Sequence, residues 1–264
     1  MIRLFHVSDV HFGREDRAAV AWFEGLVHAE KPDAVIMTGD LTMRARTHEF
    51  AAGLAWLQGL GVPTTVEVGN HDLPYFNPIA RFFRPYHRYE AVERMIEQPL
   101  DLPGIMIVPM VTTARFQWRL NWSKGRVSRR SLQQALALVE SAPKDALVFI
   151  ACHHPLIEPR TSATSATHRG AEAFAALAQA GAVAVLTGHV HDPFDIMHEV
   201  DGRKMRMIGA GTLSERTRDT PPSFNEIRVQ EGRFEVKLRT LGPEPDVVLP
   251  KERAEPGQTG AEPE

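Results

Sequence analysis

The fold can be predicted from one stretch, Ala34-Val35-Ile36-Met37-Thr38-Gly39-Asp40. Its four apolar residues lie between Pro32-Asp33 and a glycine, a pattern typical of a buried strand. Open α/β sheets bind ligands at the carboxyl ends of their strands, which is where Asp40 stands. A lone aspartate there is more often a turn former, but four other apolar runs also end in Asp, Asn or His. We therefore expect the strand ends to converge on one site around Asp40.

The composition is that of a globular protein with a full hydrophobic core. The chain has 264 residues, of which 43% are hydrophobic and 24% charged. Its formal net charge of -3 provides no strong attraction to nucleic acid or to an anionic membrane. No apolar run approaches the ~18 residues of a membrane span, and the run at 4–7 is too short for a signal peptide. Because Cys152 is the single cysteine, no internal disulfide can form, and we expect a cytoplasmic protein.

The first half of the chain contains three of the strand-end motifs. A strand over residues 2–7 leads into Asp9-Val10-His11. Residues two apart on extended chain point to the same side, so Asp9 and His11 can reach one ion. After helices at 13–31 and 47–60, a strand at 64–68 ends in Gly69-Asn70-His71-Asp72. The amide oxygen of Asn70 is a neutral ligand for a hard or borderline cation, although Gly-Asn also makes simple turns.

The second half contains two more histidine motifs at predicted strand ends. A strand at 146–151 leads to Cys152-His153-His154-Pro155. Adjacent residues on extended chain point to opposite faces, so at most one of these histidines aims at a given ion. A strand at 183–186 leads to Gly188-His189-Val190-His191, where both imidazoles leave the same face.

The other predicted strands divide between two sheets. The strand at 105–110 would complete the first sheet, whereas short strands at 206–210, 224–229 and 234–238 suit the antiparallel half of a second sheet. Helices are expected at 131–139 and 170–180.

Two regions stand apart from this pattern. Residues 73–130 mix aromatic and basic side chains and predict a cap-like insertion. This mixture suits stacking on a nucleotide base, with Arg115 as a phosphate contact, but it is also typical of a helix or loop that covers the core, or of a dimer surface. Residues 241–264 are acidic and rich in Pro, Glu and Gly, which predicts a disordered tail.

The motifs taken in order resemble those of the calcineurin-like metallophosphoesterase superfamily: Asp9-x-His11, Gly39-Asp40, Gly69-Asn70-His71-Asp72, His153 and Gly188-His189-x-His191. The forms Gly39-Asp40-Leu41-Thr42 and His153-His154-Pro155 look more like the class III cyclic-nucleotide and glycerophosphodiester phosphodiesterases. The resemblance implies a four-layer α/β/β/α sandwich of two mixed β-sheets flanked by helices, formed by residues 1–240 as one domain.

The resemblance also implies residue roles around two divalent or transition metal ions, Mn, Fe or Zn. Asp9, His11 and His191 would hold the first ion, Asn70, His153 and His189 the second, and Asp40 would bridge both. Anions between two dications are physically required because the cations repel each other. His71 would donate a proton to the leaving oxygen or bond the phosphoryl group, Asp72 would orient His71, and His154 would lie behind the ligands or on the substrate side. The expected reaction is in-line attack of metal-activated water on phosphorus.

The resembled superfamily also contains other activities. Its protein Ser/Thr phosphatases carry arginines where this chain has Leu41-Thr42-Met43 and Val68, and its UDP-sugar pyrophosphohydrolases have arginine in place of His71. Its repair nucleases share the opening Asp9-Val10-His11-Phe12-Gly13 but add a DNA-binding cap. The superfamily also includes a retromer subunit that keeps the fold as a scaffold but has lost metal ligands. Every metal-ligand position in this chain is filled by a residue able to bind a metal, so we do not expect a scaffold. We expect hydrolysis of a cyclic nucleotide or another small phosphodiester, and the alternative is a phosphomonoesterase or nuclease of the same superfamily. We expect no membrane partner, and a nucleic acid partner is not favoured. The cap could form the interface of a homodimer.

Overall fold

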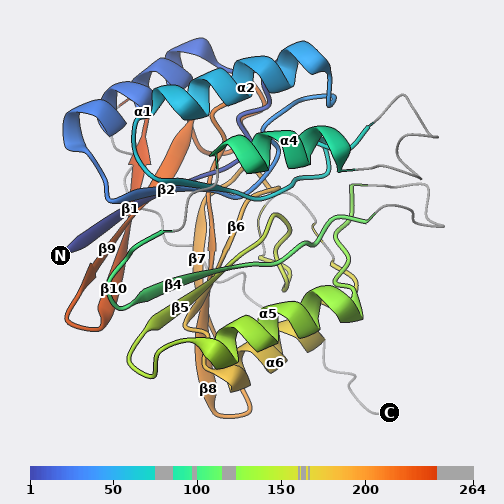
Figure 1. The fold of residues 1–264 in the computed structure, drawn as a ribbon, viewed down its shortest axis with the longest axis vertical. Helices are drawn as coiled ribbons and strands as arrows, with labels where there is room; N and C mark the ends of the chain where they lie inside the picture. The colour runs from blue at the N-terminus through green and yellow to red at the C-terminus, as the bar shows by residue number, and fades with distance from the viewer. Residues whose placement is uncertain are drawn as a thin grey trace, which may run out of the picture.

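The computed structural model describes residues 1–74, 86–96, 100–114, 123–159, 161, 165 and 167–242. Two five-stranded sheets pack against each other in this part of the chain, and helices cover the outer face of each (Figure 1). The expected four-layer α/β/β/α sandwich is therefore confirmed.

The first sheet has the strand order β10-β9-β1-β2-β3. Strands β1 (Ile2–Val7), β2 (Ala34–Met37) and β3 (Thr64–Val66) run parallel, as the β-α-β pattern predicts. Strands β9 (Ser223–Gln230) and β10 (Arg233–Thr240) were expected in the second sheet, and this expectation is wrong. Strand β9 pairs antiparallel with the edge of β1 that β2 leaves open, so the C-terminal hairpin completes the first sheet.

The second sheet has the order β4-β5-β6-β8-β7. Its parallel strands are β4 (Ile105–Pro109), β5 (Leu147–Ala151), β6 (Ala184–Thr187) and β8 (Arg203–Gly209), and β7 (Phe194–Val200) pairs antiparallel with β8. The prediction that residues 105–110 belong to the first sheet is wrong, because β4 pairs along its whole length with β5. Strand β7 begins three residues after His191 and was not predicted from the sequence.

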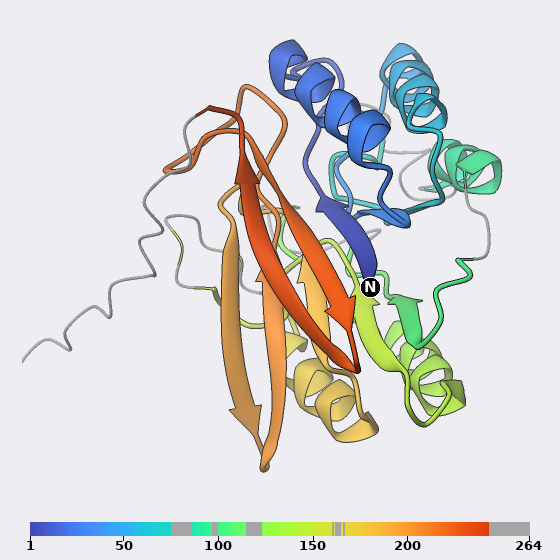
Figure 2. The same cartoon turned by 90° about the vertical axis from the view of Figure 1, so that its left-hand side faces the viewer.

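The helices divide between the two outer faces. Helices α1 (Arg17–Glu30), α2 (Thr47–Gly59) and α4 (His87–Ile96) lie on one side of the strands, and α5 (Arg129–Ser141) and α6 (Gly170–Ala180) lie on the other (Figure 2). Helix α1 starts where the side chain of Asp16 accepts hydrogen bonds from the amides of Ala18 and Ala19. It ends at Lys31, whose left-handed backbone precedes Pro32.

The hydrophobic core has three parts, one for each boundary between layers. Strand residues alternate between these parts. Phe5, Val7, Val35 and Met37 face α1 and α2, whereas Leu4 and Ile36 face the second sheet. A third cluster joins the second sheet to α5 and α6. Both sheets are thus buried on two faces, which leaves the carboxyl ends of their parallel strands as the edge where polar side chains gather.

Part of the predicted cap belongs to the sandwich itself. Helix α4 packs on α2, with Tyr89 and Val92 in the core, and β4 is an edge strand. The candidate phosphate contact Arg115 and the tail from residue 243 onward lie outside the described residues. The described helices include none that is both long enough and apolar enough to cross a membrane.

Candidate metal centre

Five loops bring the sequence motifs to one edge of the sandwich. Asp9 and His11 follow β1, Asp40 follows β2, Asn70 and His71 follow β3, His153 follows β5, and His189 and His191 follow β6. The expectation that the backbone is extended there is wrong. Five of these residues have positive φ angles of 52–73°: Asp9, His11, Asp40, His189 and His191. Such angles are uncommon outside glycine and concentrate at functional sites.

Asp9, His11 and His191 form a first buried cluster. Their burial is nearly complete, with at most 4% of any of the three residues exposed. Asp9 Oδ1 lies 3.2 Å from His191 Nε2 and 3.6 Å from His11 Nε2, and the two Nε2 atoms are 3.2 Å apart. Three ligand atoms therefore surround a single point.

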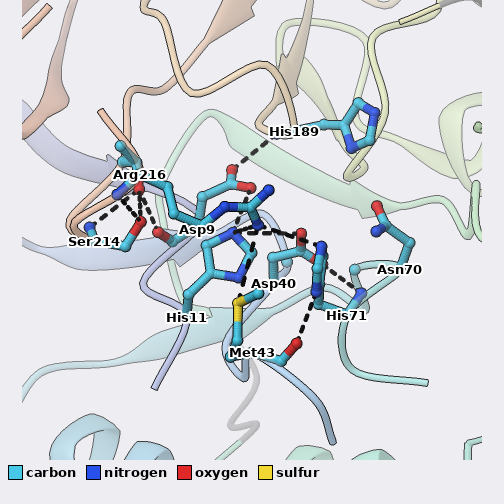
Figure 3. Close-up of polar contacts among 12 residues, drawn as sticks. Asp9, His11, Asp40, Met43, Asn70, His71, His189, Ser214 and Arg216 are labelled. Carbon is cyan, nitrogen blue, oxygen red and sulfur yellow. Dashed lines mark hydrogen bonds and ion pairs between the residues drawn. The ribbon is translucent and has the colours of Figure 1, made fainter. Parts of the chain in front are cut away.

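A second cluster forms around His153. Its Nε2 lies 3.1 Å from Asn70 Oδ1 and 3.4 Å from Asp40 Oδ2. The ring centroid of His189 is 5.1 Å from that of His153, and its backbone amide donates to Asp9 Oδ2 at 2.8 Å. Figure 3 shows His189 and Asn70 on one side of Asp40, with Asp9 and His11 on the other.

Asp40 lies between the two clusters. Its Oδ2 is 3.7 Å from His11 Nε2 and 3.4 Å from His153 Nε2. Its Oδ1 accepts a hydrogen bond from the amide of His71 at 2.8 Å, which fixes the carboxylate. One carboxylate oxygen thus faces one imidazole from each half of the sandwich.

The hydrogen bonds behind the clusters decide which ring nitrogens carry protons. His153 Nδ1 donates to the carbonyl of Thr38 at 2.8 Å, and His191 Nδ1 donates to the carbonyl of Arg216 at 2.8 Å. In each neutral ring the Nε2 lone pair therefore faces carboxylate or amide oxygens. Asp9 Oδ1 is buried and accepts no hydrogen bond from the described residues. Acceptors that face one another in this way are the arrangement that a bound cation satisfies, so the residues fit metal ions.

The charges of the site favour a positive charge, whether a proton or a metal ion, next to Asp40. Burial disfavours protonation of His153, yet the neighbouring Asp40 raises its pKa to about 9. Burial also disfavours ionisation of Asp40, but His153 and His71 lower its pKa below the usual range. Burial and the neighbouring His153 lower the pKa of His189 to about 3, which keeps this imidazole neutral and able to donate a lone pair.

The model of the calcineurin-like phosphoesterase family matches residues 2–193, which include both clusters. The chain belongs to this family. Calcineurin-like phosphoesterases use a dinuclear metal centre, and this one has His/Asp clusters able to bind metals. Family membership implies a metal-dependent phosphoric ester hydrolase.

Solved structures share the fold of this phosphoesterase. A dimetal phosphatase from Danio rerio is 16% identical, with 90% of this chain and 96% of that chain covered and a TM-score of 0.66. A purple acid phosphatase from yellow lupin is 12% identical, with 90% and 51% covered and a TM-score of 0.64. A phosphopantetheinyl hydrolase from Mycobacterium tuberculosis is 19% identical, with 80% and 89% covered and a TM-score of 0.51. No curated protein sequence matches the chain.

His71 lies at the edge of the metal centre, but Asp72 does not orient its ring. His71 Nδ1 donates to the carbonyl of Met43 at 2.7 Å. The Asp72 carboxylate instead accepts hydrogen bonds from the amides of Leu41, Thr42 and Gly69 and from the Thr42 hydroxyl, at 2.8–3.2 Å. Asp72 therefore joins the loop after β2 to the loop after β3, and the orienting role expected for it belongs to Met43.

His154 lies behind the metal centre rather than on the substrate side. It is fully buried, its Nε2 donates to the carbonyl of Ser123 at 2.9 Å, and its Nδ1 is 3.0 Å from the Thr112 hydroxyl. The chain bends at His153 and His154, so their rings are only 4.7 Å apart. The expectation that they point to opposite faces is wrong, and the His154 ring instead packs 4.5 Å from that of His189.

Two residues of the site were not found from the sequence. The Met43 carbonyl holds His71, and Arg216, from the loop after β8, reaches both His71 and His11 (Figure 3). Neither residue stands at the end of an apolar run. The one available signal for Arg216 is that its loop follows the parallel strand β8, whose carboxyl end lies at the same edge.

A groove of about 850 Å³ lies between α4, β4 and α5, and the described residues that line it include none of the candidate metal ligands. Its lining includes Val68, two residues before Asn70, and Thr113, next to the Thr112 that bonds His154. Tyr86 and Arg126 also line it, so an aromatic surface and a cation border the groove.

Proposed function

We propose that this protein is a dinuclear metal-dependent phosphodiesterase that hydrolyses a small phosphodiester such as a cyclic nucleotide. The observation that carries the proposal is the position of Asp40 Oδ2, 3.7 Å from His11 Nε2 and 3.4 Å from His153 Nε2. A single oxygen between two ligand clusters suits a carboxylate that is shared by two ions.

The ligands divide into two sets. Asp9, His11 and His191 would hold one ion, Asn70, His153 and His189 the other, and Asp40 both. Imidazole, carboxylate and amide donors together suit Mn, Fe or Zn. The carbonyls of Thr38 and Arg216 support this arrangement because they fix the tautomers of His153 and His191.

The chemistry that such ions supply is polarisation of a phosphoryl oxygen and activation of the attacking water. The role of His71 follows from its contacts. Because Nδ1–H is donated to the Met43 carbonyl, the neutral ring presents an unprotonated Nε2 to the site. His71 would thus donate a proton to the leaving oxygen, or a hydrogen bond to the phosphoryl group, only as imidazolium.

Two features support a diester with an organic group of moderate size. The motif forms Gly39-Asp40-Leu41-Thr42 and His153-His154-Pro155 are similar to those of class III phosphodiesterases. The groove next to Val68 and Thr113 offers space for such a group. Phosphomonoester hydrolysis is the second candidate, because the added positive charge of Arg216 suits a dianion.

The test is a panel assay of purified, Mn-loaded protein with cyclic AMP, glycerophosphodiesters, phosphomonoesters and single-stranded DNA. We expect the highest kcat/KM with a small diester. Asp40→Ala should abolish hydrolysis of bis-p-nitrophenyl phosphate and most metal binding, whereas Asp101→Ala, a change of an exposed carboxylate, should alter neither. Full activity of Asp40→Ala would overturn the dinuclear assignment, and a preference for monoesters would select the second candidate.

A further inference from the structure

Arg216 is built into the first ligand cluster through its backbone. Its carbonyl accepts the Nδ1–H of His191 at 2.8 Å, and its amide donates to the Ser214 hydroxyl oxygen at 3.3 Å. Ser214 contacts the hydroxyl of Thr212 at 2.7 Å, and that hydroxyl donates to the carbonyl of Asp9 at 2.6 Å. The Arg216 backbone is thus linked to His191 through its carbonyl and to Asp9 through its amide.

The guanidinium of Arg216 extends across the mouth of this cluster. Its Nη1 lies 3.3 Å from His71 Nε2 and 3.4 Å from His11 Nε2 (Figure 3). Because Nδ1 of His71 donates to Met43, the Nε2 of the neutral ring accepts from Arg216. Arg216 therefore lies over the space between a proposed metal ligand and the proposed proton donor.

This cation has no anionic partner among the residues that the structure describes. Arg3, Arg206 and Arg239 each pair with a carboxylate. Among the described residues, the Arg216 guanidinium instead contacts the imidazoles of His11 and His71 and the sulfur of Met43. A half-buried guanidinium beside a site for two cations is unfavourable unless an anion compensates it.

We propose that Arg216 binds the non-bridging phosphoryl oxygens of the substrate, at the side of the metal centre bounded by His71. The inference rests on the proposed function, because the anion it invokes is the phosphoester. The planar guanidinium donates two parallel hydrogen bonds that match phosphate oxygens. A metal ion held at this centre would engage the lone pair of His11 Nε2, and Nη1 would then turn from His11 and His71 to the phosphoryl group, which leaves His71 Nε2 able to carry a proton. Arg216 thereby positions the leaving oxygen toward His71.

The experiment compares Arg216→Gln and Arg216→Lys with the wild-type protein, and uses Arg218→Gln as the control. Arg218 is an exposed arginine two residues further along the same loop. Inorganic phosphate binding to each Mn-loaded protein is measured by calorimetry, metal content by elemental analysis, and KM and kcat with bis-p-nitrophenyl phosphate.

We expect Arg216→Gln to retain the full metal content and to bind phosphate about 10- to 100-fold more weakly, because a hydrogen bond to a charged group is lost. KM should rise more than kcat falls, Arg216→Lys should restore part of the affinity, and Arg218→Gln should match the wild type. Unchanged phosphate affinity in Arg216→Gln, or loss of metal in that variant, would overturn the inference. A wild-type protein that binds two metal ions and phosphate but hydrolyses no phosphoester would refute the proposed function instead.

Discussion

His71 and Met43 are joined by a hydrogen bond of 2.7 Å from the imidazole Nδ1–H to the backbone carbonyl, so the ring turns its Nε2 toward the metal centre. The contact depends on the backbone of Met43 and not on its side chain. It connects the loop after β2 with the loop after β3, the two loops that also supply Asp40 and Asn70.

His71→Gln should lower kcat by about 10²- to 10⁴-fold, the usual range for loss of a proton donor. The loss should be smaller for p-nitrophenyl esters than for alkyl esters, because p-nitrophenolate leaves without protonation. Steady-state kinetics on both substrate types measure this difference. His48→Gln is the matched control, since His48 is exposed on α2. Equal losses on the two substrate types would exclude proton donation by His71.

Metal titration should separate the two ligand sets. Calorimetry of the wild-type protein should detect two ions, whereas His191→Ala should retain the site around His153 and His153→Ala the site around His191. Because the ions bind the folded protein, the melting temperature of the wild type should rise with metal concentration and fall on chelation. A single ion in the wild type, or no rise in melting temperature, would contradict two separate sites.

Gly69→Ala tests the space beside the Asp40 carboxylate. A Cβ at Gly69 would come within 2.0 Å of Asp40 Oδ1 and 2.1 Å of the Asp40 amide. Asp40 must therefore move, and we expect loss of one or both ions and a destabilisation of about 1–3 kcal/mol. Gly59→Ala in α2 is the control, since its Cβ would meet only Glu24 Oε1, at 3.8 Å. Elemental analysis and thermal unfolding of both variants would check the difference, and normal metal content in Gly69→Ala would contradict it.

Asp72→Asn should destabilise the protein without a large change in shape at the site. All four groups that contact the Asp72 carboxylate are donors, and an amide can accept at only one of its two terminal atoms. The buried donors left without an acceptor should cost about 1–3 kcal/mol. Chemical denaturation would measure this loss, with the exposed Asp145→Asn as control. A loss of activity with unchanged stability would instead indicate that Asp72 acts on His71 after all.

Glu226 predicts a contribution to stability that depends on pH. Its buried carboxylate accepts hydrogen bonds from Arg3, Arg228 and Arg239 at 2.7–3.0 Å. Burial opposes ionisation, but these arginines lower the pKa from 4.5 to about 2. A lowered pKa in the folded state adds stability above pH 4.5, and that stability is lost as the pH falls from 4.5 toward 2.

The change Glu226→Gln should therefore reduce the free energy of unfolding at pH 7 by roughly 1–3 kcal/mol, with allowance for solvent screening of the arginines. The difference from the wild type should shrink as the pH falls below 4.5. Denaturant unfolding between pH 7 and pH 3 measures this convergence. The exposed Glu235→Gln on β10 is the control, and a difference between wild type and Glu226→Gln that stays constant with pH would contradict the prediction.

The sequence predicted the four-layer fold through its resemblance to a known family, and its local patterns predicted the side chains that lie at the ligand-binding edge. Asp9, Asp40, Asn70, His153 and His189 each stand directly behind an apolar run, and both the run and its polar end are local features of the chain. Parallel strands of one sheet end at a common edge, so these local features predict that Asp9, Asp40 and Asn70 meet, and that His153 and His189 meet. The packing of the two sheets brings the two sets together. The family match, which covers residues 2–193, confirms the resemblance drawn from the same motifs.

Tertiary structure alone decided the sheet to which β4, β9 and β10 belong, and which groups surround the ligands. Strand β9 pairs with β1 across more than 200 residues of sequence, and the local pattern of a strand does not specify the strand with which it pairs. Arg216 approaches His11 over a separation of 205 residues, from a loop with no periodic signal. The Met43 carbonyl that holds His71 is a backbone atom, which any residue type would supply. Contacts of this kind depend on how distant loops pack, and for that reason no local stretch of the chain encodes them.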